Sequence, residues 1–128
     1  MKKIAFFSLA ICTTLAIVWG IFALPPADVA SDTSKKAEQH FEKAVERIRQ
    51  LMYEDAIAEL EQVITLVPKS KIAHDAQYWI GQAYFRAGQF DAALSTFEKL
   101  TEEYPESAIT PVTLLMVERV RKAKENKK

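Results

Sequence analysis

The chain has 128 residues, 49% of them apolar, and its 17 basic side chains balance 17 acidic ones. This length suffices for one small domain, and the zero formal charge excludes a chain-wide basic field for nucleic acid. The single cysteine excludes a disulfide framework and a cysteine-based zinc cluster. Since there are only two histidines, His40 and His74, the composition argues against an enzyme.

The first predicted element is an apolar run from Ile4 to Leu24 that contains no charged residue. As a helix it would be about 31 Å long, close to the hydrocarbon thickness of a bilayer. Two alternatives stay open: an uncleaved membrane anchor, or a signal peptide cleaved after Ala23 or Ala30. Because Lys2 and Lys3 precede the run, the positive-inside rule places the N-terminus in the cytoplasm and residues 31–128 across the membrane.

Residues 25–34 are predicted to be a linker that ends in four candidate N-cap residues, Ser31, Asp32, Thr33 and Ser34. Beyond them, apolar residues recur at three- and four-residue spacings, which predicts helices over 34–50, 53–66, 71–87, 90–103 and 110–125. Gly88 suits a left-handed cap at the end of the third helix. Pro111 suits the first turn of the fifth.

The helices repeat. Shifting the chain by about 37 residues places small, aromatic and proline residues on their counterparts: Ala44 on Gly81, Tyr53 on Phe90, Ala56 on Ala93, Leu60 on Phe97, Val63 on Leu100 and Pro68 on Pro105. Each unit is a helix pair closed by a proline. The shift also aligns Pro111 with His74, and a single helix follows.

These residues resemble the tetratricopeptide repeat. The complete pattern lies in residues 74–107, a weaker one in 37–70, where Ala44 replaces the glycine, and a capping helix in about 110–125. The resemblance implies an all-α fold: a short solenoid of two helix–turn–helix repeats plus a capping helix, behind an N-terminal transmembrane or signal helix. The expected domains are 1–30 and 31–128. We call the first helix of each repeat helix A and the second helix B. Gly81 would let helix A approach helix B, with Tyr84 and Phe97 filling the wedge beside them.

Two features resemble bacterial envelope tetratricopeptide proteins of the YbgF/CpoB, BamD and YfgM types. They are the repeat period, which is longer than is usual in the family, and the motif Tyr78-Trp79-Ile80-Gly81-Gln82. This implies a non-catalytic, membrane-anchored scaffold of the cell envelope, held by residues 4–24 in the inner membrane with its repeats in the periplasm. Its partner would be an envelope protein or peptide, not nucleic acid. The alternative is a cleaved, secreted or periplasmic structural subunit that forms homo-oligomers through its repeat ends.

In this family the concave face is built from helix A side chains. Carried over to this chain, the expected partner-binding residues are Phe41, Ile48, Arg49, Tyr78, Gln82, Phe85 and Arg86, and the capping helix adds Val112, Leu115, Met116 and Arg119. The alternative is that the aromatic residues pack in the core and that Arg86 pairs with Asp75 or Glu42. No catalytic group, cofactor or metal site is expected, and both histidines are interpreted as solvated or capping.

The basic tail has three interpretations: a solvated helix end whose positive charges interact favourably with the helix dipole, contact with anionic lipid headgroups, or contact with an acidic partner. It contains Arg119, Arg121, Lys122, Lys124, Lys127 and Lys128.

Overall fold

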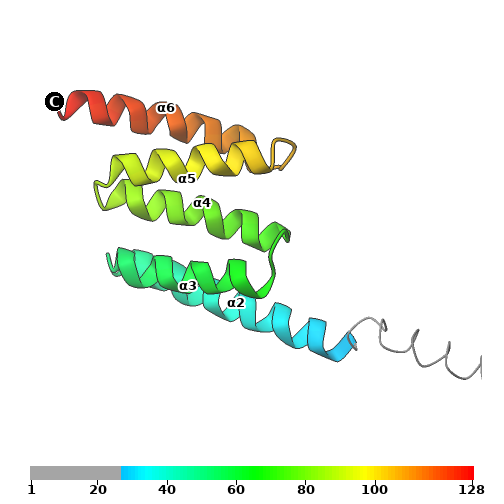
Figure 1. The fold of residues 1–128 in the computed structure, drawn as a ribbon. Coiled ribbons are helices and arrows are strands. Elements are labelled where there is room, and N and C mark those ends of the chain that lie inside the picture. The colour runs from blue at the N-terminus through cyan, green and yellow to red at the C-terminus, as the bar shows by residue number, and fades with distance from the viewer. Residues whose placement is uncertain (1–26) are drawn as a thin grey trace, which may run out of the picture. The chain divides into compact units, whose positions relative to one another are not determined.

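A computed structural model describes residues 27–128, which form five α-helices (Figure 1). They are α2 (Ala27–Arg49), α3 (Tyr53–Leu66), α4 (Lys71–Arg86), α5 (Phe90–Glu103) and α6 (Thr110–Asn126). The chain divides into two compact units, Met1–Ala30 and Ser31–Lys128. The predicted anchor, residues 4–24, lies outside the described residues. Among the helices that are described, none combines the length and apolar character needed to cross a membrane.

The start of α2 differs from the prediction, because the helix begins at Ala27 and the expected linker is helical from there on. The four residues predicted as N-caps lie inside the helix instead. After Pro25-Pro26 no proline or glycine interrupts the chain before the helix ends, and Asp28 in the first turn favours the helix dipole. The other helix bounds agree with the prediction to within one residue.

Within residues 31–128 the helices alternate in direction: α2, α4 and α6 run one way, and α3 and α5 run the other (Figure 1). Their apolar faces meet in two core clusters. The first joins buried residues of α2, α3 and α4, and the second joins α5 and α6 with aromatic residues of α4 packed against them. Tyr84 packs against both clusters. Helix α4 is therefore the element that the two halves share.

The predicted close approach at Gly81 is confirmed. A Cβ atom built on Gly81 would lie 2.5 Å from Cε1 of Phe97, closer than any real carbon contact. Phe97 itself is fully buried, so its ring takes the space that a side chain at position 81 would need. The glycine thus lets α4 and α5 pack around one large ring.

The predicted cap at Gly88 is also confirmed, with a φ of 78°. The amide of Gly88 donates to the carbonyl of Phe85 and that of Gln89 to Tyr84, which is the Schellman arrangement. The same two bonds close α2, where Leu51 donates to Ile48 and Met52 to Arg47. Here the left-handed position is held by Leu51, with a φ of 64°. Thus the first repeat copies the turn without its glycine.

This difference gives a stability prediction. A left-handed conformation costs a residue with a Cβ about 1–2 kcal/mol, and the Leu51 side chain is 69% exposed, so it contributes little packing in return. We expect Leu51→Gly to stabilise the full chain by about 1 kcal/mol, after the greater entropy that glycine has in the unfolded chain is subtracted. Thermal unfolding followed by circular dichroism should show a higher Tm. Gly88→Ala is the matched control and should lower it; an unchanged Tm in both variants would contradict the argument.

Candidate functional site

A groove of about 380 Å³ lies between α4 and α6, and we call it the α4–α6 groove. It is lined by Tyr78, Gln82, Val112, Leu115, Met116 and Arg119. On the α4 side, Nε2 of Gln82 donates a hydrogen bond to the Tyr78 hydroxyl over 2.8 Å. The Tyr78 ring packs on that of Phe97, with 5.7 Å between the ring centroids. The core therefore positions one wall of the groove.

The α6 side of the groove is apolar and open to solvent. Leu115 is 71% exposed and Val112 is 45% exposed, whereas Met116 is 6% exposed. The opposite stripe of α6, which includes Thr113, Val117 and Val120, is buried. Large apolar side chains at such exposure are unusual where several lie together, and they are typical of contact surfaces.

The predicted binding residues have different surroundings. Tyr78 and Gln82 line the groove. Phe41 and Phe85 are half-buried: Phe41 packs against the first core cluster and Phe85 against the second, its ring 5.7 Å from that of Phe90. Tyr78 and Phe85 both pack against the second core cluster while remaining partly exposed, which agrees in part with the alternative that the aromatic residues pack in the core.

Ile48 is a correction, because it is 2% exposed and belongs to the first core cluster. It continues the buried stripe that Ala37 and Ala44 begin on α2, at spacings of one and two helical turns. A side chain in this place stabilises the packing of α2 and has no surface to offer to a partner.

The two predicted arginines are exposed. Arg49 lies 3.7 Å from Glu46, with both side chains mostly in solvent. Arg86 forms no ion pair with any described residue, so the expected alternative of a pair with Asp75 or Glu42 is not observed. Arg86 is one helical turn beyond Gln82 on α4, towards the C-terminal end of the helix.

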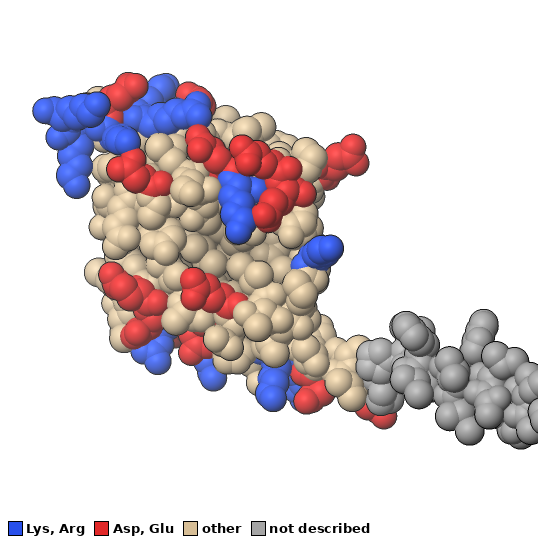
Figure 2. Space-filling view, viewed as in Figure 1, with Lys and Arg blue, Asp and Glu red and all other residues tan. Residues whose placement is uncertain are grey.

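Basic side chains gather at the C-terminal end of α6 (Figure 2), and several of them contact α5. Arg121 donates hydrogen bonds to Glu98 over 3.0 Å and to Glu118 over 2.9 Å. The hydrogen bond with Glu98 is the main reason that the pKa of Arg121 is raised above its ordinary value. Lys124 pairs with Asp91. These contacts hold part of the tail against α5.

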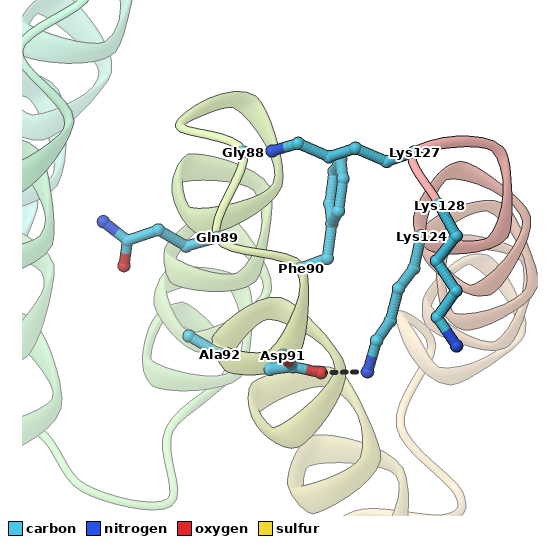
Figure 3. A pocket seen from close by; sticks show the side chains of 8 residues that line it. All are labelled: Gly88, Gln89, Phe90, Asp91, Ala92, Lys124, Lys127 and Lys128. Atoms are coloured by element: carbon cyan, nitrogen blue, oxygen red, sulfur yellow. Dashed lines mark hydrogen bonds and ion pairs between the residues drawn. The ribbon is translucent and has the colours of Figure 1, made fainter.

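A second pocket, of about 450 Å³, lies where the end of α6 meets the turn between α4 and α5 (Figure 3). Its lining includes Gly88, Phe90, Lys124, Lys127 and Lys128. The Lys127 amine lies 5.4 Å from the centre of the Phe90 ring, a cation–π contact. This pocket is not predicted by the sequence, because only the packing of α6 against α5 brings the tail lysines to that turn.

The histidines have separate surroundings. Nδ1 of His40 lies 2.5 Å from Oε2 of Glu59, a contact that joins α2 to α3. His74 stacks on Tyr104 with 3.8 Å between ring centroids, and its Nδ1 lies 3.4 Å from the Ser107 hydroxyl. Within residues 27–128 no group of three or more histidine, cysteine or acidic side chains is arranged to hold a metal ion.

Comparison with known proteins agrees with the repeat. The sequence model of the tetratricopeptide repeat family matches residues 75–107, a segment that covers α4 from Asp75 onwards, the whole of α5 and the turn after it. No curated protein and no solved structure matches the chain. The match and the five described helices support a tetratricopeptide repeat protein with an all-α solenoid. Such repeats suggest a role in protein–protein interaction.

Proposed function

We propose that this protein is a non-catalytic scaffold of the bacterial cell envelope that binds a partner protein through the helix A face. We define the helix A face as the accessible side chains on the predicted inner side of α2, α4 and α6. The observation that carries the proposal is the α4–α6 groove, where Val112 and Leu115 are exposed beside the ordered Tyr78–Gln82 pair. A few anchoring apolar residues next to ordered polar groups are typical of protein interfaces.

The sequence supports a membrane location for this function. The uncharged run over 4–24 is long enough for a span, and Lys2 and Lys3 favour a cytoplasmic N-terminus. Anchored in this way in the inner membrane, with residues 31–128 in the periplasm, the protein meets membrane-bound partners at a raised effective concentration. The likeness to YbgF/CpoB-, BamD- and YfgM-type proteins is the basis for assigning it to the envelope.

Crosslinking in bacterial cells tests the proposal. We expect a photo-crosslinkable residue at position 115 to capture a discrete envelope protein, identified by mass spectrometry, because Leu115 is the most exposed apolar side chain of the groove. The same probe at position 51 is the matched control, since Leu51 is 69% exposed but lies at the α2–α3 turn. Val112→Lys should reduce capture at position 115 several-fold, because it places a charge in the apolar wall.

Equal capture of the same protein from positions 51 and 115 would contradict a role for the groove. Capture of only the protein's own chain would favour a second candidate function, a structural subunit that assembles through its repeat ends. The observation behind this candidate is that Leu114, 53% exposed, extends the open apolar surface of α6, where a solenoid would normally continue with another helix. An intact mass that begins after Ala23 or Ala30 would favour the cleaved form of that subunit.

A further inference from the structure

The charged residues of the helix A face are sorted by sign along the helices. Arg49 and Arg86 lie in the last turns of α2 and α4, and Arg119 lies in the C-terminal half of α6. The acidic residues Glu38, Glu42 and Asp75 lie earlier in α2 and α4. Because α2, α4 and α6 run in the same direction (Figure 1), the three arginines belong to one side of the face.

Helix dipoles alone do not account for this distribution. All five described helices carry a dipole that favours cations at the C-terminal end. Basic residues nevertheless occupy the last turns of α2, α4 and α6 and are absent from the last turns of α3 and α5. The cations are therefore concentrated on the helices that form the helix A face.

Contacts within the fold account for some of these cations but not for those beside the groove. Arg47 lies 3.5 Å from Asp55, and Lys124 pairs with Asp91, so these two side chains reach towards α3 and α5. Arg86 and Arg119 form no ion pair with any described residue. Arg119 is also the only charged residue among those that line the α4–α6 groove.

The repeat register places apolar residues next to these arginines. Shifted by the repeat period, Phe41, Tyr78 and Leu115 occupy equivalent positions on α2, α4 and α6, and Gln82 is equivalent to Arg119. The apolar row is thus one helical turn away from the row that holds Arg119. A ligand that fits both rows needs an apolar side chain with a carboxylate close to it.

We propose that the α4–α6 groove binds an acidic–apolar segment of the partner protein. An apolar side chain of the segment packs on Tyr78 and Leu115, and a neighbouring carboxylate binds Arg119, with Arg86 as a second cation one turn beyond Gln82. This inference rests on the proposed function and adds the chemistry of the partner. The proposed preference for an acidic ligand is opposite to the one expected from the net charge of residues 32–116, which carry more acidic than basic side chains.

Three fluorescent peptides of equal length test this inference: each has the same central leucines, flanked by glutamates, glutamines or lysines. Fluorescence anisotropy with the full chain should show the glutamate peptide binding about ten-fold more tightly than the lysine peptide, with the difference shrinking at high salt. Arg119→Gln should weaken the glutamate peptide about five-fold and leave the glutamine peptide unchanged. Arg121→Gln is the matched control. It removes the same charge from a side chain that lies two residues further along α6 and contacts α5.

Tighter binding of the lysine peptide would show that the net acidic charge of residues 32–116 determines the preference, and would overturn the inference. Equal loss in the Arg119 and Arg121 variants would also overturn it, as would the absence of binding by all three peptides. The proposed function is judged separately, by crosslinking from position 115. A partner captured there whose capture is insensitive to Arg119→Gln would leave the scaffold function standing and remove its acidic–apolar specificity.

Discussion

Phe97→Ala should destabilise residues 31–128 by about 4 kcal/mol, the largest effect that we expect from a single substitution. Phe97 is fully buried and is the largest side chain in that state. Its ring fills the space above Gly81 and contacts the Tyr78 ring. Removing it therefore leaves a cavity at the junction of α4 and α5, and a domain of this size has only about 5–15 kcal/mol of stability to lose.

Urea unfolding of the full chain, followed by circular dichroism, measures this effect through the denaturation midpoint. Ser95→Ala is a suitable control, since Ser95 is exposed on the same helix and should change stability by less than about 0.5 kcal/mol. A loss below about 1 kcal/mol for Phe97→Ala would mean that the ring is not packed as described. Since Tyr78 is held by Phe97, this variant should also weaken any binding to the α4–α6 groove.

Gly81→Ala should cost about 1–2 kcal/mol, although alanine is the better helix former. The added Cβ would lie 2.5 Å from the Phe97 ring, so this fully buried ring would have to shift. The first repeat shows a compatible alternative, because Ala44 and Leu60 occupy the equivalent positions and both are fully buried. A smaller side chain opposite the helix thus accompanies the additional methyl group.

The double variant Gly81→Ala/Phe97→Leu should accordingly be more stable than the sum of its two single changes predicts, by about 1 kcal/mol or more. A double-mutant cycle by urea unfolding gives this coupling energy. The reverse exchange, Ala44→Gly/Leu60→Phe, is the matched experiment in the first repeat, where Leu60→Phe alone should destabilise. Strict additivity in both cycles would show that the two positions do not compete for the same space.

The repeat pattern predicted most of the fold because its physical causes are local. Spacing of apolar residues gave the helices, and Gly88 marked a turn that only a left-handed residue can make. The long-range contact between Gly81 and Phe97 was also predictable, since a small residue opposite a large one recurs in register. The start of α2 was not, because Ser31–Ser34 can cap a helix as well as continue one.

The candidate site was less predictable than the fold. Tyr78 and Gln82 lie in the groove as their positions on helix A suggest, whereas Ile48 is in the core. The spacing of Ala37, Ala44 and Ile48 is compatible with a buried stripe on α2, whereas the positions carried over from the family predict that Ile48 binds a partner. The lysine pocket at the α4–α5 turn depends on where α6 ends after packing, which local patterns do not encode.

The position of α4 in both core clusters has a consequence for how this chain can change in length. Neither helix pair holds a complete apolar interior, since α2 and α3 cover one side of α4 while α5 and α6 cover the other. Excision of α2 and α3, or of α5 and α6, would leave the side of α4 that they cover facing water. Duplication would instead add a new α4-like helix already covered on both sides. The architecture therefore tolerates growth by whole repeats far more readily than loss of one.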